Sequence, residues 1–81
     1  MKNKQIFNID ELDSLFLNLN HLNFIKLKST ILHIEYMIRL RINVTICKSK
    51  TINIYNIKDQ KLVNQEDVNW VLRKRYATIF N

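Results

Sequence analysis

The stretch that decides the predicted fold is LHIEYMIRLRINVTI, residues 32–46. Every even position in it holds an apolar side chain, and the odd positions hold polar or charged ones, with Met37 as the exception. Because successive side chains of a strand point to opposite faces, this alternation predicts a long strand with one buried face and one wet, basic face.

Two shorter segments flank this strand and complete the predicted sheet. Residues 24–28 alternate with the opposite parity, which predicts a first strand joined to the long one by a turn near Ser29. Residues 51–57 alternate after a loop at 48–50, and their apolar positions match the long strand across a hairpin. The competing interpretation is a helix that begins at Ser29, with strand starting only near Arg41.

Two amphipathic helices are predicted outside the sheet. The first follows Asn8, which can cap it, and the second runs over residues 65–80 after a cap at Asn64. The apolar stripe of the second helix consists of Val68, Val71, Leu72, Tyr76 and Ile79. The predicted fold class is therefore α+β. We expect a single domain over residues 1–81, a two-layer sandwich with an antiparallel sheet of about three strands and both helices on one face.

Composition narrows the classes of partner and site. The formal net charge is +6 and the pI is about 9.7, which favours acidic partners such as nucleic acid or an acidic protein surface. The sequence has no glycine and no proline, so glycine-built phosphate loops are excluded. Its many Asn, Ile and Lys residues are typical of an AT-rich genome, a bias that weakens arguments from charge.

Features that bear on compartment are few. The single cysteine, Cys47, cannot form an internal disulfide, which is compatible with a reducing compartment. No apolar run approaches the roughly 20 residues needed to span a bilayer, and the N-terminus lacks the apolar core of a signal peptide. We therefore expect a protein of the cytoplasm or an organellar matrix, with no membrane partner.

The wet face of the predicted sheet is the first candidate site. Arginine and lysine neutralise phosphates, and an exposed tyrosine offers a ring on which a base can stack. This surface predicts binding to RNA, as a small basic RNA-binding protein or a component of a ribonucleoprotein. Its candidate residues are Arg39, Arg41, Tyr55, Lys26, Lys28, Lys48 and Lys50.

The back of the C-terminal helix is the second candidate site. Trp70, Arg73 and Lys74 face away from its apolar stripe, and tryptophan and arginine are common anchors of protein interfaces. The alternative function is thus a protein–protein adaptor or inhibitor, for instance a phage, plasmid or viral product that covers an acidic partner. Equally, Trp70 could pack under residues 1–7.

Catalysis is not expected. His33, Glu35 and the two nearby arginines could in principle cleave RNA, but any alternating strand of this length produces such a set by chance. No cluster of Cys, His and carboxylates has the spacing of a metal site, and no cofactor motif is present. The sequence predicts a binding protein with no cofactor and leaves its oligomeric state open.

Overall fold

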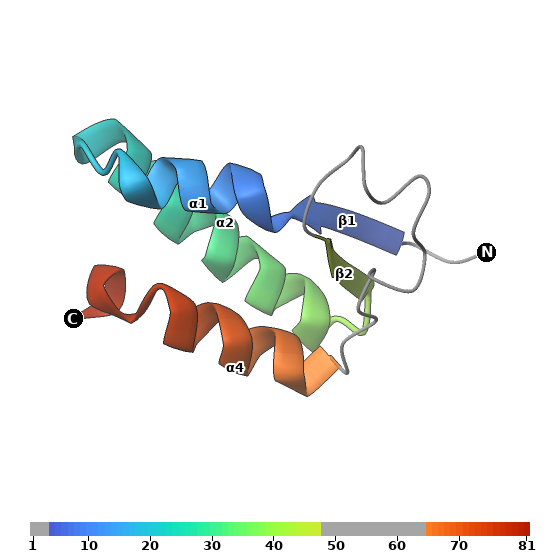
Figure 1. Cartoon of the computed structure of the whole chain (residues 1–81). Helices are drawn as coiled ribbons and strands as arrows, with labels where there is room; N and C mark the ends of the chain where they lie inside the picture. The colour runs from blue at the N-terminus through green and yellow to red at the C-terminus, as the bar shows by residue number, and fades with distance from the viewer. Residues whose placement is uncertain (1–3, 48–64) are drawn as a thin grey trace.

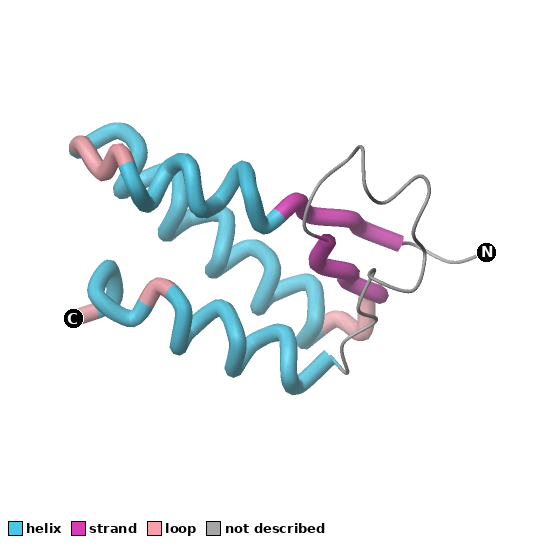
Figure 2. Tube along the Cα trace, viewed as in Figure 1, coloured by secondary structure: helices cyan, strands magenta, loops and turns pink. Residues whose placement is uncertain are grey.

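The structure is a computed structural model that describes residues 4–47 and 65–81. In chain order its elements are β1 (Lys4–Asn8), α1 (Ile9–Leu17), α2 (His21–Arg39), β2 (Asn43–Cys47), α4 (Gln65–Arg75) and the 3-10 helix η2 (Ala77–Phe80). The three α-helices run side by side, and the two strands form a small sheet at one end (Figure 1). Helix, not sheet, makes up most of the described chain (Figure 2).

The prediction of a long strand over residues 32–46 is wrong. Residues 32–39 belong to α2, which also contains the predicted first strand, residues 24–28. The reason lies in the spacing of Leu27, Ile31, Ile34 and Met37, which are buried at helical intervals on one side of α2. Within residues 32–46 the strand begins only at Asn43, so the competing interpretation, helix first and then strand, was closer, although α2 begins at His21 rather than Ser29.

The sheet also differs from the predicted antiparallel sandwich. It has two strands, β1 and β2, which pair in parallel with Ile6 opposite Thr45 and Phe7 opposite Ile46. Parallel strands need a long crossover, and here α1 and α2 supply it, leading the chain away from the sheet and back. The third predicted strand, residues 51–57, lies outside the described residues.

The predicted wet face of the sheet is not observed. Thr45, expected on that face, is only 3% exposed, and Val44 and Cys47 are buried as well. Arg39 ends α2, and Arg41 lies in the turn before β2 with a left-handed φ of 66°. Because neither arginine is in a strand, no basic sheet face forms from them.

The helix boundaries agree better with the sequence. Asn8 caps α1 as predicted, since its Oδ1 accepts a hydrogen bond from the Asp10 amide at 2.8 Å. The C-terminal helix begins at Gln65 as predicted, but ends at Arg75 and gives way to η2. The predicted cap at Asn64 lies outside the described residues.

The core lies where the three helices meet. Its fully buried side chains come from α2 (Leu27, Ile31 and Ile34), from α4 and η2 (Val68, Leu72 and Ile79), from Tyr76 between them, and from Val44 of β2. This packing fixes α4 against α2 and α1 and determines which side of each helix faces solvent.

Candidate functional site

Helix α4 is attached to α1 by a polar contact at its C-terminal end. Arg75 donates two hydrogen bonds to the Asp13 carboxylate, Nε to Oδ1 at 2.9 Å and Nη2 to Oδ2 at 2.6 Å. The Tyr76 hydroxyl donates a third hydrogen bond to Oδ1 at 2.6 Å. Two donors from one guanidinium fix both the distance and the orientation of the helices.

The same contact shifts the ionisation of its members. The hydrogen bonds from Arg75, assisted by that from Tyr76, lower the pKa of Asp13 below its ordinary value, against a smaller opposing effect of burial. The Asp13 carboxylate in turn raises the pKa of Arg75. Burial, followed by the bond to Asp13, raises the pKa of Tyr76. All three groups therefore keep their pairing charge states at neutral pH.

A second ion pair attaches α4 to α2. Arg73 donates from Nε and Nη2 to the two oxygens of Glu35, at 2.6 and 3.0 Å, and this bonding raises the pKa of Arg73. The Arg73 guanidinium also lies 4.0 Å from the centre of the Phe80 ring, and Lys28 Nζ lies 5.7 Å from the same ring. Arg73, a predicted partner-binding residue, is thus largely occupied within the chain.

The side of α4 opposite the core carries a tryptophan. Trp70 and Val71 lie three and four residues after Asp67, and Lys74 lies four and three residues after them. All four are exposed, so they form one stripe, which we term the α4 outer face. Trp70 is 61% exposed, and Lys74 Nζ lies 4.6 Å above its ring. The alternative, with Trp70 packed under the N-terminal residues, is wrong for the described chain, where β1 instead pairs with β2.

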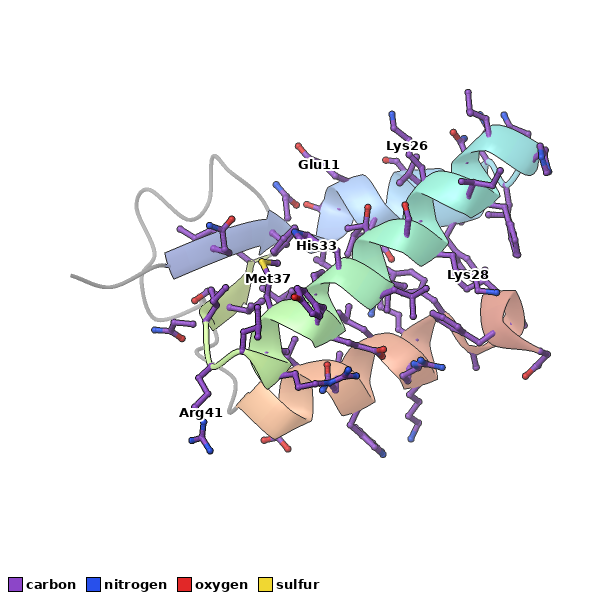
Figure 3. All side chains as sticks on the ribbon, turned by 180° about the vertical axis from the view of Figure 1, so that it is seen from behind. Glu11, Lys26, Lys28, His33, Met37 and Arg41 are labelled. Carbon is purple, nitrogen blue, oxygen red and sulfur yellow. The ribbon has the colours of Figure 1, made fainter. Side chains whose placement is uncertain are left out.

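The predicted nucleic-acid residues do not gather in one place. Lys26 and Lys28 point to opposite sides of α2, and Arg41 lies beyond the far end of that helix (Figure 3). Lys28 is half-buried against Phe24 and Phe80 rather than free on a flat surface. The remaining predicted residues, Lys48, Lys50 and Tyr55, lie outside the described residues.

One exposed surface was missed by the sequence interpretation. Leu22, Ile25, Leu32 and Tyr36 of α2, with Leu40 just after it, are 44–69% exposed. We term this set the α2 outer face. Its signal was present in the sequence as apolar residues spaced by three and four, but Ile25 was assigned to one predicted strand and Leu32, Tyr36 and Leu40 to another.

Features of catalytic or membrane-spanning proteins are scarce in the described part of the chain. Residues 33 and 35 lie on different sides of α2, and Glu35 is bound to Arg73, so the set considered for RNA cleavage does not converge. Within residues 4–47 and 65–81, no group of three metal-ligating side chains is found, and no helix is both long enough and apolar enough to cross a bilayer.

Comparison of the chain with known protein families, with curated proteins and with solved structures finds no match.

Proposed function

We propose that this chain is a non-catalytic protein-binding module that docks the α4 outer face onto an acidic protein surface. The observation that carries the proposal is Trp70, a large ring that stands exposed on α4 beside a lysine. Tryptophan is enriched among the residues that contribute most to protein interfaces, because it buries much area and loses few rotatable bonds.

The attachment of α4 to its neighbours supports this function. The contacts Arg73–Glu35 and Arg75–Asp13 hold the helix from both sides, so the position of Trp70 is set before a partner arrives. An anchor that is already in place loses less conformational entropy on binding. Lys74 and the net charge of +6 favour a partner of negative charge.

RNA is the second candidate, favoured by the same pair of residues. A base can stack on an exposed tryptophan while a nearby lysine contacts phosphate. However, Arg73 and Arg75 are paired with carboxylates, and among the described residues Lys74 is the cation that lies over the ring. Since tight RNA binding needs several phosphates to be neutralised together, the distribution of charge favours a protein partner.

A pull-down with and without nuclease tests the proposal. The tagged chain, its Trp70→Ala variant and a Leu17→Ala control are compared, because Leu17 is an exposed apolar residue on α1, away from α4. We expect a co-purifying protein that survives nuclease, is lost with Trp70→Ala and is kept with Leu17→Ala. Loss of the partner on nuclease treatment supports RNA instead, and retention by Trp70→Ala contradicts both candidates.

Fluorescence then reports contact directly. Trp70 is the only tryptophan of the chain, so emission excited in the indole band comes from this one site. Addition of the purified partner should shift the emission to shorter wavelength as the ring leaves water. Unchanged emission at saturating partner would show that binding occurs elsewhere.

A further inference from the structure

Helix α2 is apolar on two opposite sides, and the described residues bury only one of them. Its inner side carries Leu27, Ile31 and Ile34, all fully buried. The α2 outer face lies opposite, with Leu22 69%, Leu32 44% and Tyr36 52% exposed. Contiguous exposed apolar side chains of this kind are typical of surfaces that another molecule covers.

The spacing of the outer face is that of a coiled-coil seam. Leu22, Ile25, Ser29, Leu32, Tyr36 and Arg39 are separated alternately by three and four residues, the repeat that keeps a stripe facing a partner helix, and the charged Arg39 ends this stripe. Ser29, at the centre, is small, and its hydroxyl donates to the Lys26 carbonyl at 3.2 Å, so it can be covered without losing a hydrogen bond.

We propose that the α2 outer face is the seam of an antiparallel homodimer, in which α2 packs against α2 of a second copy. The charges that border the seam select this occupant and this orientation. Lys28 and Glu35 border the seam on the side of α4, whereas Lys26 and His33 border it on the other side. The edge of the seam on the side of α4 thus carries both a positive and a negative charge. The same edge of a second copy offers the complementary pair.

In antiparallel packing, the edge of the seam on the side of α4 lies beside the same edge of the second copy. When Ile25 lies opposite Tyr36 of the second copy, and Ser29 opposite its Leu32, Lys28 of each chain lies beside Glu35 of the other and can reach it by exchanging its contacts with the Phe24 and Phe80 rings. Parallel packing would instead place Lys28 beside His33 and leave no pair of opposite charges. Glu35 can accept a second donor while it binds Arg73, because a carboxylate offers about four acceptor positions.

The dimer is expected to be weak and strengthened by salt. The seam involves one half-exposed helix face per chain, a small interface, so we expect a dissociation constant on the order of tens of micromolar. Each copy carries a charge of +6, and salt screens this repulsion more than it weakens the two Lys28–Glu35 attractions, while the apolar contact is unaffected. RNA binding would show the opposite salt dependence.

Sedimentation velocity over a range of protein concentrations tests the dimer. We expect the wild-type chain to dimerise, and Leu32→Glu to raise the dissociation constant at least about tenfold while the helical circular dichroism is unchanged. Tyr36→Ser serves as a second, uncharged seam variant. The control Leu17→Glu puts the same charge on another exposed leucine and should dimerise like the wild type.

Disulfide trapping tests the orientation. In a Cys47→Ala background, a mixture of Ile25→Cys and Tyr36→Cys chains should form a cross-linked pair, whereas Ile25→Cys alone should not. Two copies of position 25 lie about 16 Å apart along an antiparallel seam, beyond the reach of a disulfide. The proposal is overturned if the wild-type chain stays monomeric, or if Leu17→Glu dissociates like Leu32→Glu. The antiparallel arrangement is overturned if Ile25→Cys chains cross-link efficiently with each other.

The result is separable from the proposed function. Trp70 lies on α4, outside the seam, so Trp70→Ala should leave dimerisation unchanged while it abolishes partner capture.

Discussion

Replacing Asp13 with asparagine should destabilise the fold by about 2 kcal/mol at neutral pH. The change keeps the side-chain volume and removes the charge that accepts bonds from Arg75 and Tyr76. An ion pair whose members are 49% and 26% exposed contributes about 1 kcal/mol. Asparagine also has one acceptor oxygen where the carboxylate has two, so an NH2 group must face Arg75 or Tyr76, and the lost hydrogen bond costs about 1 kcal/mol more.

The effect has a defined dependence on pH. The folded-state pKa of Asp13 lies below its ordinary value of 3.8, so its carboxylate stabilises the fold above that value and stops doing so as the pH falls through the folded pKa. Thermal unfolding followed by circular dichroism should show the variant melting about 8–16 °C lower at neutral pH. The difference from wild type should shrink as the pH is lowered below about 3.8.

A matched substitution and a double-mutant cycle complete the test. Asp10→Asn, on the exposed side of the same helix, loses only the attraction of a carboxylate to the helix N-terminus, about 0.5 kcal/mol. Combining Asp13→Asn with Arg75→Gln should reveal a coupling of about 1 kcal/mol. If Asp13→Asn costs no more than Asp10→Asn, or if the coupling is absent, α4 is not attached to α1 in this way.

Substitutions at four further positions probe other parts of the account by denaturant unfolding. Asn20→Ala should cost about 1 kcal/mol, because Asn20 Oδ1 caps α2 by accepting from the Asn23 amide at 2.8 Å; a neutral result contradicts the cap. Ile31→Ala should cost about 2–5 kcal/mol as a fully buried residue, and a cost under about 1 kcal/mol would place it outside the core. Because Arg41 has a φ of 66°, Arg41→Gly should stabilise the fold by up to about 1 kcal/mol and Arg41→Val should destabilise it. The reverse order of stabilities would rule out the left-handed turn at this residue. Trp70→Ala should change the free energy of unfolding by less than about 0.5 kcal/mol, and a larger loss means that the ring is buried.

The misassigned strand has a physical explanation. Two residues of a helix advance by about 200°, so side chains at i and i+2 lie on nearly opposite sides of a helix, whereas in a strand they lie on the same face. Leu32 and Tyr36 lie on the outer face of α2, whereas Ile34 is buried and Ile38 is partly buried on the inner side. A helix that is apolar on both sides therefore has apolar residues at every second position, as a strand with one buried face does. The local sequence pattern alone cannot distinguish the two.

Other parts of the account were accessible from local signals. The cap at Asn8 and the start of the C-terminal helix depend on residues near each other in sequence, as does the placement of Trp70 away from the apolar stripe. The parallel pairing of β1 with β2 and the contacts Asp13–Arg75 and Glu35–Arg73 join residues far apart in the chain. A single sequence carries no local signal for such contacts, so they had to come from the structure.

The most direct measurement is the set of backbone chemical shifts over residues 32–46 in solution. Helical shifts from Leu32 to Arg39, a break over residues 40–42 and extended shifts from Asn43 are the expected result. Extended shifts throughout the stretch would contradict it, remove the α2 outer face and place the two arginines back on a sheet.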